Sequence, residues 1–277
     1  MSLLFISKKA LQTYLAFAQN TALEAGKLLM SYYGEIYETH TKSNKVDLLT
    51  TADIKADQLI CQIINKKYPK HNILTEESGL KKSKNNEFTW IIDPLDGTTN
   101  FIHSLPIFSV SIALEYNKET IIGVVYNPAA KKLFYAAKHC GAYLNNKPII
   151  VSETKKLENS LLVTGFPYKQ DAMWNKSFDL FKEFYSKTQG IRRLGSASLD
   201  YCFVAMGRFD GFYEFNLNPW DILAGQLIVN ESRGRATNWN NKNSKRGKRI
   251  LATNNLIHNE MLNILNQSNY KNIFNID

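Results

Sequence analysis

The sequence predicts a mixed protein with an α+β first half and an α/β second half. Two observations carry this prediction. Before residue 70, apolar residues recur at the four- and three-residue spacing of amphipathic helices, whereas residues 88–137 hold four short segments rich in β-branched and aromatic residues. After residue 160, strand-like segments alternate with helical ones, which is typical of an α/β arrangement.

Two helices are predicted at the start of the chain. The first has an apolar stripe from Leu11 to Tyr32, with Ser7 as its N-terminal cap and Gly34 at its end. The second begins after Thr50, whose spacing to Asp53 is that of a capping box, and ends before Pro69.

Strands are predicted from residue 72 onward. In the first half they cover residues 88–92, 108–116, 120–126 and 133–137, with hairpin turns at Asn117-Lys118 and Asn145-Asn146. In the second half, strands 161–165, 211–215 and 249–253 alternate with helices near 172–188, 196–207, 219–232 and 255–267. The polar segment 152–159 is the best candidate boundary, which gives halves of residues 1–150 and 151–277.

The composition is that of a globular protein without a membrane anchor. The chain has 277 residues, of which 44% are hydrophobic and 21% charged, and no apolar run approaches the roughly 20 residues that a membrane helix needs. The apolar run at residues 3–6 is too short for a signal-peptide core. The odd number of widely spaced cysteines indicates reduced thiols, so we expect a cytoplasmic protein.

The net charge of +9 raises the question of an acidic partner. Lysine is abundant throughout the chain, and one dense basic cluster stands out, formed by Lys242, Lys245, Arg246, Lys248 and Arg249. A solvated loop is the simpler interpretation of this cluster, and a patch that binds nucleic acid is the alternative.

Acidic residues stand at the exit of a buried strand. The apolar segment 90–92 runs into Asp93, Pro94 is expected to stop the strand, and Asp96 follows just before Gly97 and Thr98. Two carboxylates followed by small hydrogen-bonding residues suit a hard cation and a phosphate group, because magnesium prefers oxygen ligands. Glycine lets the backbone approach an anion, and a helical turn after it would present amide donors. An acidic turn with helix caps is the alternative interpretation.

Two further acidic positions strengthen this interpretation. Glu76 and Glu77 follow the short apolar strand 73–75, and Asp221 opens an apolar helical stretch after Trp220. Taken alone, the first pair could be ordinary surface charge, and Asp221 could serve only the helix dipole.

These segments resemble the signatures of the inositol monophosphatase family. The resemblance rests on four motifs in the family's order, at residues 42–53 (KSNKVDLLTTAD), 76–78 (EES), 90–101 (WIIDPLDGTTNF) and 219–225 (PWDILAG). Residues 192–200 (RRLGSASLD) and 207–212 (GRFDGF) look most like the bacterial extragenic-suppressor (SuhB) subgroup.

The resemblance implies an αβαβα sandwich, usually assembled as a homodimer, with a site between the two halves. It implies two or three Mg²⁺ ions held by the side chains of Glu76, Asp93, Asp96 and Asp221 and by the Leu95 carbonyl. It assigns the phosphate to Gly97 and Thr98, the attacking water to Glu76 and Thr98, and the orientation of Thr98 to Asp53. The alcohol part would lie against Gly195, Ser196, Ala197, Glu214 and Asp96.

The predicted activity is therefore Mg²⁺-dependent, lithium-sensitive hydrolysis of a small phosphomonoester, foremost myo-inositol monophosphate. The alternatives within the fold are a fructose-1,6-bisphosphatase and a 3′(2′),5′-bisphosphate nucleotidase. Glu214 favours a hydroxyl-rich substrate, because a carboxylate accepts from hydroxyl groups and repels a second phosphate. An alternative of another class is an accessory factor of transcription or ribosome assembly that binds RNA polymerase components or RNA.

One segment departs from the family pattern. Where the family tends to carry paired glycines and then an aspartate, this chain has Ser232, Arg233, Gly234 and, further on, Asn238. These departures lie outside the predicted metal ligands, so we expect activity to survive them and local conformation and substrate preference to be affected.

Overall fold

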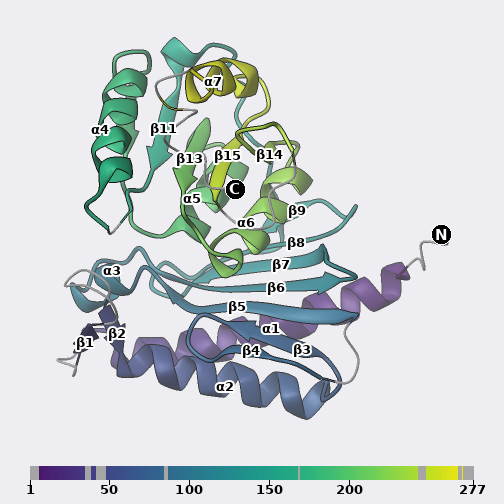
Figure 1. The fold of residues 1–277 in the computed structure, drawn as a ribbon. Helices are drawn as coiled ribbons and strands as arrows, with labels where there is room; N and C mark the ends of the chain where they lie inside the picture. The colour runs from purple at the N-terminus through teal and green to yellow at the C-terminus, as the bar shows by residue number, and fades with distance from the viewer. Residues whose placement is uncertain are drawn as a thin grey trace.

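Helices and sheets alternate in five layers in the computed structural model (Figure 1). The structure describes residues 6–34, 39–41, 48–83, 87–167, 169–242, 248–267 and 270. Helices α1 (Lys8–Tyr32) and α2 (Thr51–Lys67) cover one face of an eight-stranded sheet, and α5 (Ala197–Ala205) and α6 (Pro219–Glu231) fill the space between it and a five-stranded sheet. Helices α4 (Ala172–Tyr185) and α7 (His258–Leu265) lie outside the second sheet. The αβαβα sandwich is thereby confirmed.

The first helix packs against the large sheet through small side chains. Ser7 caps it as predicted, because its side chain accepts a hydrogen bond from the Ala10 N–H. Ala18, Ala22 and Ala25 are fully buried on its inner face. A short pair of strands, β1 (Thr39–Thr41) and β2 (Leu48–Thr50), precedes α2. Residues 42–47, which carry much of the first family motif, lie outside the described residues, as does the Thr50 side chain of the predicted capping box.

The large sheet has the strand order β10-β9-β8-β7-β6-β5-β3-β4. Its strands are β3 (Asn72–Thr75), β4 (Gly79–Lys81), β5 (Phe88–Asp96), β6 (Ser109–Tyr116), β7 (Glu119–Asn127), β8 (Lys132–Ala137), β9 (Ala142–Leu144) and β10 (Lys147–Pro148). The neighbouring strands β3 and β5 run parallel, so their carboxyl ends meet at one edge of the sheet. Both predicted hairpin turns are present, with all four residues at positive φ.

The prediction that Pro94 stops its strand is wrong. Strand β5 continues through Asp96, and its register against β6 shifts between Asp93 and Asp96 by one extra residue. A bulge leaves one position without a ladder partner, which is where a strand tolerates a proline that has no N–H. The bulge brings Asp93, Leu95 and Asp96 within one short irregular segment.

The five-stranded sheet has the order β12-β11-β13-β15-β14. Its strands are β11 (Leu161–Thr164), β12 (Gly190–Arg192), β13 (Gly211–Phe215), β14 (Arg235–Asn238) and β15 (Arg249–Thr253), preceded by a short 3₁₀ helix, η1 (Leu157–Asn159). Within the described part, the short strands β1, β2, β4, β9, β10, β12 and β14 were not predicted. Each is four residues or shorter, too short to show a period.

Helix α6 is held very close to the large sheet. A Cβ atom added to Gly123 of β7 would stand 2.6 Å from the Ala224 carbonyl oxygen, so only glycine permits this approach. Apolar residues of both sheets share one core with α5 and α6, including Ile91, Phe134 and Phe212. The start of α6 is therefore fixed over the end of β5.

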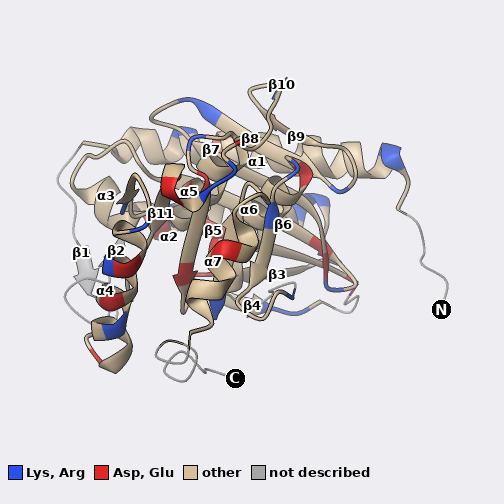
Figure 2. Cartoon of the chain, turned by 90° about the horizontal axis from the view of Figure 1, so that it is seen from above, with Lys and Arg blue, Asp and Glu red and all other residues tan. Residues whose placement is uncertain are grey.

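The basic cluster is smaller than the sequence indicated. Arg249 is buried in β15 at 6% exposure, and Lys245 and Arg246 lie outside the described residues. In the coloured part of Figure 2, Lys and Arg are scattered over helices and loops without forming one patch in that view. None of the described helices is long and apolar enough to cross a membrane.

Candidate active site

The bulged end of β5 supplies the first carboxylates of the site. Asp93 is 1% exposed, and its Oδ1 accepts a hydrogen bond from the Leu95 N–H at 3.0 Å. Asp96 is buried as well, and its Oδ2 accepts bonds from the Ser196 hydroxyl at 2.7 Å and from the Ser198 N–H at 2.8 Å. Asp93 is thus oriented by a donor of its own segment, and Asp96 by donors from the start of α5.

Two other elements bring acidic residues to the same place. The Glu76 N–H extends the β3–β5 ladder by donating to the Ile92 carbonyl at 3.2 Å, which sets Glu76 beside the end of β5. Ser111, the partner of Asp93 across β5 and β6, donates from its hydroxyl to the Trp220 carbonyl at 3.1 Å. This bond ties the first turn of α6, and with it Asp221, to the sheet next to Asp93.

Asp221 also caps its own helix. Its Oδ2 accepts from the Asn218 N–H at 2.6 Å, and together with the Asn218 side chain it completes a capping box ahead of Pro219. The alternative interpretation of Asp221 as a helix N-terminal acid is therefore correct, and it coexists with a place in the site. One oxygen serves the cap while the carboxylate still lines the cavity.

Burial and mutual repulsion disfavour the charged state of this cluster. Burial raises the pKa of Asp93 well above its usual range, and the nearby charges of Glu76, Asp96, Asp221 and Asp53 raise it further. Burial likewise raises the pKa of Asp221, and its backbone hydrogen bond from Asn218 only partly offsets the effect. The positive charge of a bound cation would offset both effects, because it stabilises the ionised carboxylates.

Next to the carboxylates, Gly97 and Thr98 form a turn suited to an anion. Gly97 has φ 93°, and a Cβ atom there would stand 2.9 Å from the Ile107 carbonyl oxygen, so the position requires glycine. Helix α3 (Thr98–Ile102) begins directly after it, which confirms the predicted helical turn. The Asn100 side chain donates to the carbonyls of Ile107 and Leu194 and so joins this turn to the segment before α5.

Glu214 reaches the site from β13 of the second sheet. Its carboxylate lies against the backbone of Gly165, where a Cβ atom would stand only 2.1 Å from Oε1. Burial raises the pKa of Glu214 to about 8, with Arg193 lowering it and Asp96 raising it. Gly195, Ser196 and Ala197 lie nearby at the start of α5.

A cavity of about 300 Å³ brings these groups together. Of the twelve predicted site residues, eleven line it: Glu76, Asp93, Leu95, Asp96, Gly97, Thr98, Gly195, Ser196, Ala197, Glu214 and Asp221. Asp53 does not line the cavity. It is buried at 2% exposure in the first turn of α2, close enough for its charge to raise the pKa of Asp93.

Several lining residues had not been singled out from the sequence. They include Gly165, Phe166, Arg193, Asp200 and residues 216–218. Arg193 and Asp200 belong to the segment that carried the subgroup resemblance, and this was the available signal. The others come from loops whose position depends on the packing of the second sheet.

The cavity fits a divalent cation by its donor chemistry. Of the described residues that line it, six are acidic and Arg193 alone is basic. Within the described residues, the side chains as they stand form no group of three His, Cys, Asp or Glu that could by itself hold a metal ion. Magnesium does not need such a group, because it uses one or two carboxylates with substrate phosphate and water.

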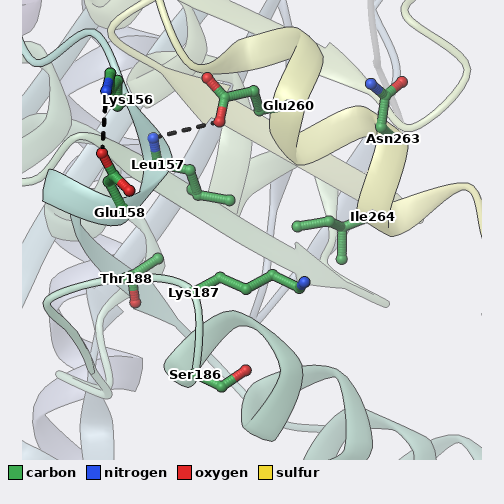
Figure 3. A pocket seen from close by; sticks show the side chains of 9 residues that line it. All are labelled: Lys156, Leu157, Glu158, Ser186, Lys187, Thr188, Glu260, Asn263 and Ile264. Carbon is green, nitrogen blue, oxygen red and sulfur yellow. Dashed lines mark hydrogen bonds and ion pairs between the residues drawn. The ribbon is translucent and has the colours of Figure 1, made fainter.

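A larger cavity, of about 810 Å³, lies in the second half of the chain, where η1, the end of α4 and α7 meet (Figure 3). Three of its charged side chains have partners: Lys156 pairs with Glu158 at 3.2 Å, and Glu260 accepts a hydrogen bond from the Leu157 N–H at 3.4 Å. Among the described residues, this larger cavity brings together only two acidic ones, whereas six line the smaller one, so the smaller cavity is the candidate active site.

Comparison with known proteins agrees with this geometry. The model of the inositol monophosphatase family matches residues 10–271, nearly the whole chain. The chain belongs to the inositol monophosphatase family. This membership confirms the resemblance read from the four motifs and supports phosphatase activity.

The relatives that are similar to the chain carry two kinds of name, inositol-1-monophosphatase and SuhB. The inositol-1-monophosphatase of Synechocystis sp. is 44% identical over 92% of the chain and 89% of its own length. The Nus factor SuhB of Pasteurella multocida is 40% identical over 83% of the chain and 86% of its own length. The crystal structure of the extragenic suppressor protein suhB from Bartonella henselae, 36% identical, has a TM-score of 0.88 and covers 92% of the chain and 99% of that protein.

Proposed function

We propose that the protein is a Mg²⁺-dependent phosphomonoesterase that hydrolyses myo-inositol monophosphate or a closely similar polyol phosphate. The observation that carries this proposal is the cavity in which buried carboxylates face a glycine turn suited to phosphate. The excess of acidic over basic side chains in the cavity lining favours binding of a cation, and the glycine turn favours binding of an anion. A metal-bridged phosphate ester satisfies both.

In this proposal, two or three Mg²⁺ ions are held by Glu76, Asp93, Asp96 and Asp221 and by the Leu95 carbonyl. Such ions neutralise phosphate charge and lower the pKa of water. The Leu95 carbonyl already accepts from the Thr98 hydroxyl at 3.1 Å, but a carbonyl oxygen has two lone pairs and can face a cation as well. Asp96 is fully engaged on Oδ2, so Oδ1 is the oxygen assigned to the metal.

The phosphate is assigned to Gly97 and Thr98, whose N–H groups belong to the unsatisfied first turn of α3. Glu76 and the Thr98 hydroxyl hold the attacking water, and Asp53 orients Thr98. As the structure stands, the Thr98 hydroxyl donates to Leu95, so it must turn to accept or hold water during the reaction. Hydroxyl rotation is inexpensive, and this assignment therefore demands no backbone change.

The leaving alcohol is assigned to Gly195, Ser196, Ala197, Glu214 and Asp96. Carboxyl groups form hydrogen bonds with hydroxyl groups and offer no positive charge to a second phosphate, which favours a polyol monophosphate over fructose 1,6-bisphosphate or a 3′(2′),5′-bisphosphate nucleotide. A solved relative at 25% identity and TM-score 0.80, SaIMPase-II, is described as bound to inositol monophosphate. This supports the same substrate class here.

Phosphate release from a panel of esters tests the proposal. We expect myo-inositol 1-phosphate to be hydrolysed with Mg²⁺, no turnover with EDTA, and inhibition by Li⁺. Turnover that survives chelation would contradict the proposal. Preference for a bisphosphate would move the assignment to one of the two alternatives within the fold.

A second candidate function is supported by the relatives named Nus factor SuhB. It is an accessory role in transcription or ribosome assembly through RNA polymerase components or RNA. Binding of RNA by Lys242 and its basic neighbours should weaken steeply with salt, since about four phosphate contacts give a log–log slope near −3 to −4. Filter binding between 50 and 200 mM salt, with the Asp93→Asn variant in parallel, tests whether such binding is separate from hydrolysis.

The proposal also includes a homodimer and a cytoplasmic location. The homodimer is what the family resemblance implies, and light scattering of the purified chain tests it. All three cysteines, Cys61, Cys140 and Cys202, are free thiols, which favours a reducing compartment.

A further inference from the structure

Asp200 is a buried carboxylate without an assigned role. It stands at the fourth position of α5, is 1% exposed, and lines the same cavity as Glu214. Its Oδ1 atom is buried and has no hydrogen-bond partner in the described part of the chain. Buried polar atoms are nearly always paired with protein, water or a ligand, so an unpaired carboxylate oxygen at a cavity wall indicates a position where a donor from the cavity can bind.

The surroundings of Asp200 make an unoccupied site unfavourable. Burial raises its pKa well above the usual range, and Glu214 and Asp96 raise it further, while Arg193 alone lowers it. Arg193 lies over Gly195, where a Cβ atom would stand 2.5 Å from its Nη1. Arg193 is thus the one basic side chain beside several carboxylates in the described lining, and none of its neighbours donates a hydrogen bond to Asp200 Oδ1.

A structural role would look different. Asp210, a buried aspartate on the approach to β13, has both oxygens engaged: Oδ1 accepts from the Ser152 hydroxyl at 2.5 Å and Oδ2 from the Leu161 N–H at 2.7 Å. Asp210 ties the segment around Ser152 to the start of β11, and both of its carboxylate oxygens have partners. Asp200 makes no such connection through Oδ1, so the fold does not account for it.

We propose that Asp200 is a second hydroxyl-binding residue of the leaving-group subsite, where it accepts a hydrogen bond from the polyol beside Glu214. This inference rests on the proposed function and deepens it. Two carboxyl groups on one wall select an alcohol with more than one hydroxyl, and Arg193 limits their repulsion. A ligand hydroxyl supplies the donor that Oδ1 lacks, and a leaving group with no hydroxyl besides the esterified one would leave Oδ1 unpaired.

The test compares two esters of the same ring size, myo-inositol 1-phosphate and cyclohexyl phosphate, which lacks the hydroxyls. The measured quantity is the ratio of their kcat/KM values in Asp200→Asn, Asp200→Ala and Asp210→Asn, with thermal unfolding of each variant without ligand. We expect Asp200→Asn to lower the ratio about tenfold, since hydrogen bonds to charged groups contribute more than neutral ones. Asp200→Ala should lower it further, and Asp210→Asn should leave it within about twofold.

Stability separates this role from a structural one. Asp200→Asn should keep or raise the unfolding temperature, because it relieves repulsion from Glu214 and Asp96, whereas Asp210→Asn should lower it. Equal losses on both esters together with a lower unfolding temperature would overturn the inference. An unchanged ratio in Asp200→Asn would do the same, even where Asp200→Ala failed to fold. Hydrolysis of neither ester by the unmodified chain would instead remove the proposed function, and this inference with it.

Discussion

Ser196 donates a hydrogen bond from its hydroxyl to the Asp96 carboxylate at 2.7 Å, although a hundred residues of chain separate them. The hydroxyl and N–H of Ser198 bind the same oxygen. Asp96 ends a strand of the eight-stranded sheet, whereas both serines open α5, which leads toward the second sheet. The pKa of Asp96, a proposed metal ligand, therefore depends on how the start of α5 packs against the end of β5.

Ser198→Ala should weaken metal binding without disturbing the fold. The two serines lower the pKa of Asp96 against the effect of burial, so losing one donor raises it again and favours the proton over a cation. We expect the Mg²⁺ concentration for half-maximal rate to rise about tenfold at neutral pH, since bonds to charged groups contribute about 1.5–3 kcal/mol. Ser177→Ala, which removes a buried hydroxyl of α4 that does not line the cavity, is the control. An unchanged Mg²⁺ requirement would contradict the assignment.

Asp93→Asn tests the cluster as a whole. The substitution removes the charge at the centre of the carboxylates and hardly changes volume, so Mg²⁺-dependent turnover should fall by at least about a thousandfold. In EDTA its unfolding temperature should equal or exceed that of the unmodified protein, because repulsion from Glu76, Asp96 and Asp221 is relieved. Phosphate release and calorimetry measure the two effects. Near-normal turnover would refute the whole site assignment.

The long elements and the site carboxylates could be predicted from the sequence, and the reasons are local. Helix α1 has a clear apolar period and a serine cap, and the segment around Asp93 has acids where a buried strand ends. Asp200 shows why other residues could not be predicted. On a helical stripe it is merely one polar position among apolar neighbours, and its burial beside Glu214 results from the packing of α5 on β13.

The prediction that the strand stops at Pro94 is wrong for a related reason. A proline interrupts the hydrogen-bond ladder of a regular strand. The sequence alone gives no sign that β5 has one extra residue at this point relative to its partner strand β6. The bulge depends on pairing with Ser109 and Ser111, which follow after a turn and a short helix. Local propensity therefore predicted the wrong end for the strand and the right position for the acids.

Arg233→Gly should stabilise the protein. Arg233 follows the end of α6 at φ 71°, and the next N–H, of Gly234, donates to the Val229 carbonyl at 3.0 Å, as in a Schellman motif. This left-handed position costs a residue with a side chain about 1–2 kcal/mol, and the family tends to place glycine in this segment. Urea unfolding should show a gain of about 1 kcal/mol, reduced by the flexibility of glycine in the unfolded chain. A loss of stability would mean that the Arg233 side chain makes a contact worth more than the strain.

Glu214→Gln should change the pH dependence of stability in a direction fixed by its pKa. Burial raises the folded pKa to about 8, above an unfolded value near 4.3, so between these values the folded state binds the extra proton. The contribution of Glu214 to the free energy of unfolding thus falls as pH rises from about 4.5 to 8. Glutamine carries no charge, so the advantage of the variant should grow across that window in EDTA. Exposed Glu158→Gln is the control, and a constant difference across the window would contradict the prediction.

Gly165→Ala should displace Glu214 without disrupting the backbone. The new Cβ would stand 2.1 Å from Oε1 of Glu214, and the atoms it meets are the end of a flexible side chain, which can move. The backbone of Gly165 is not in the left-handed region, so alanine itself fits. We expect kcat/KM for myo-inositol 1-phosphate to fall at least about tenfold, because a misplacement of about 1 Å at a positioning group can cost a hundredfold. Cyclohexyl phosphate, which offers Glu214 no hydroxyl, should lose less. Gly211→Ala is the matched control in β13, since its Cβ would meet the flexible Met261 side chain at 2.6 Å, away from the cavity. If both alanine variants lowered kcat/KM for the two esters by the same factor, Glu214 would have no part in recognising the alcohol.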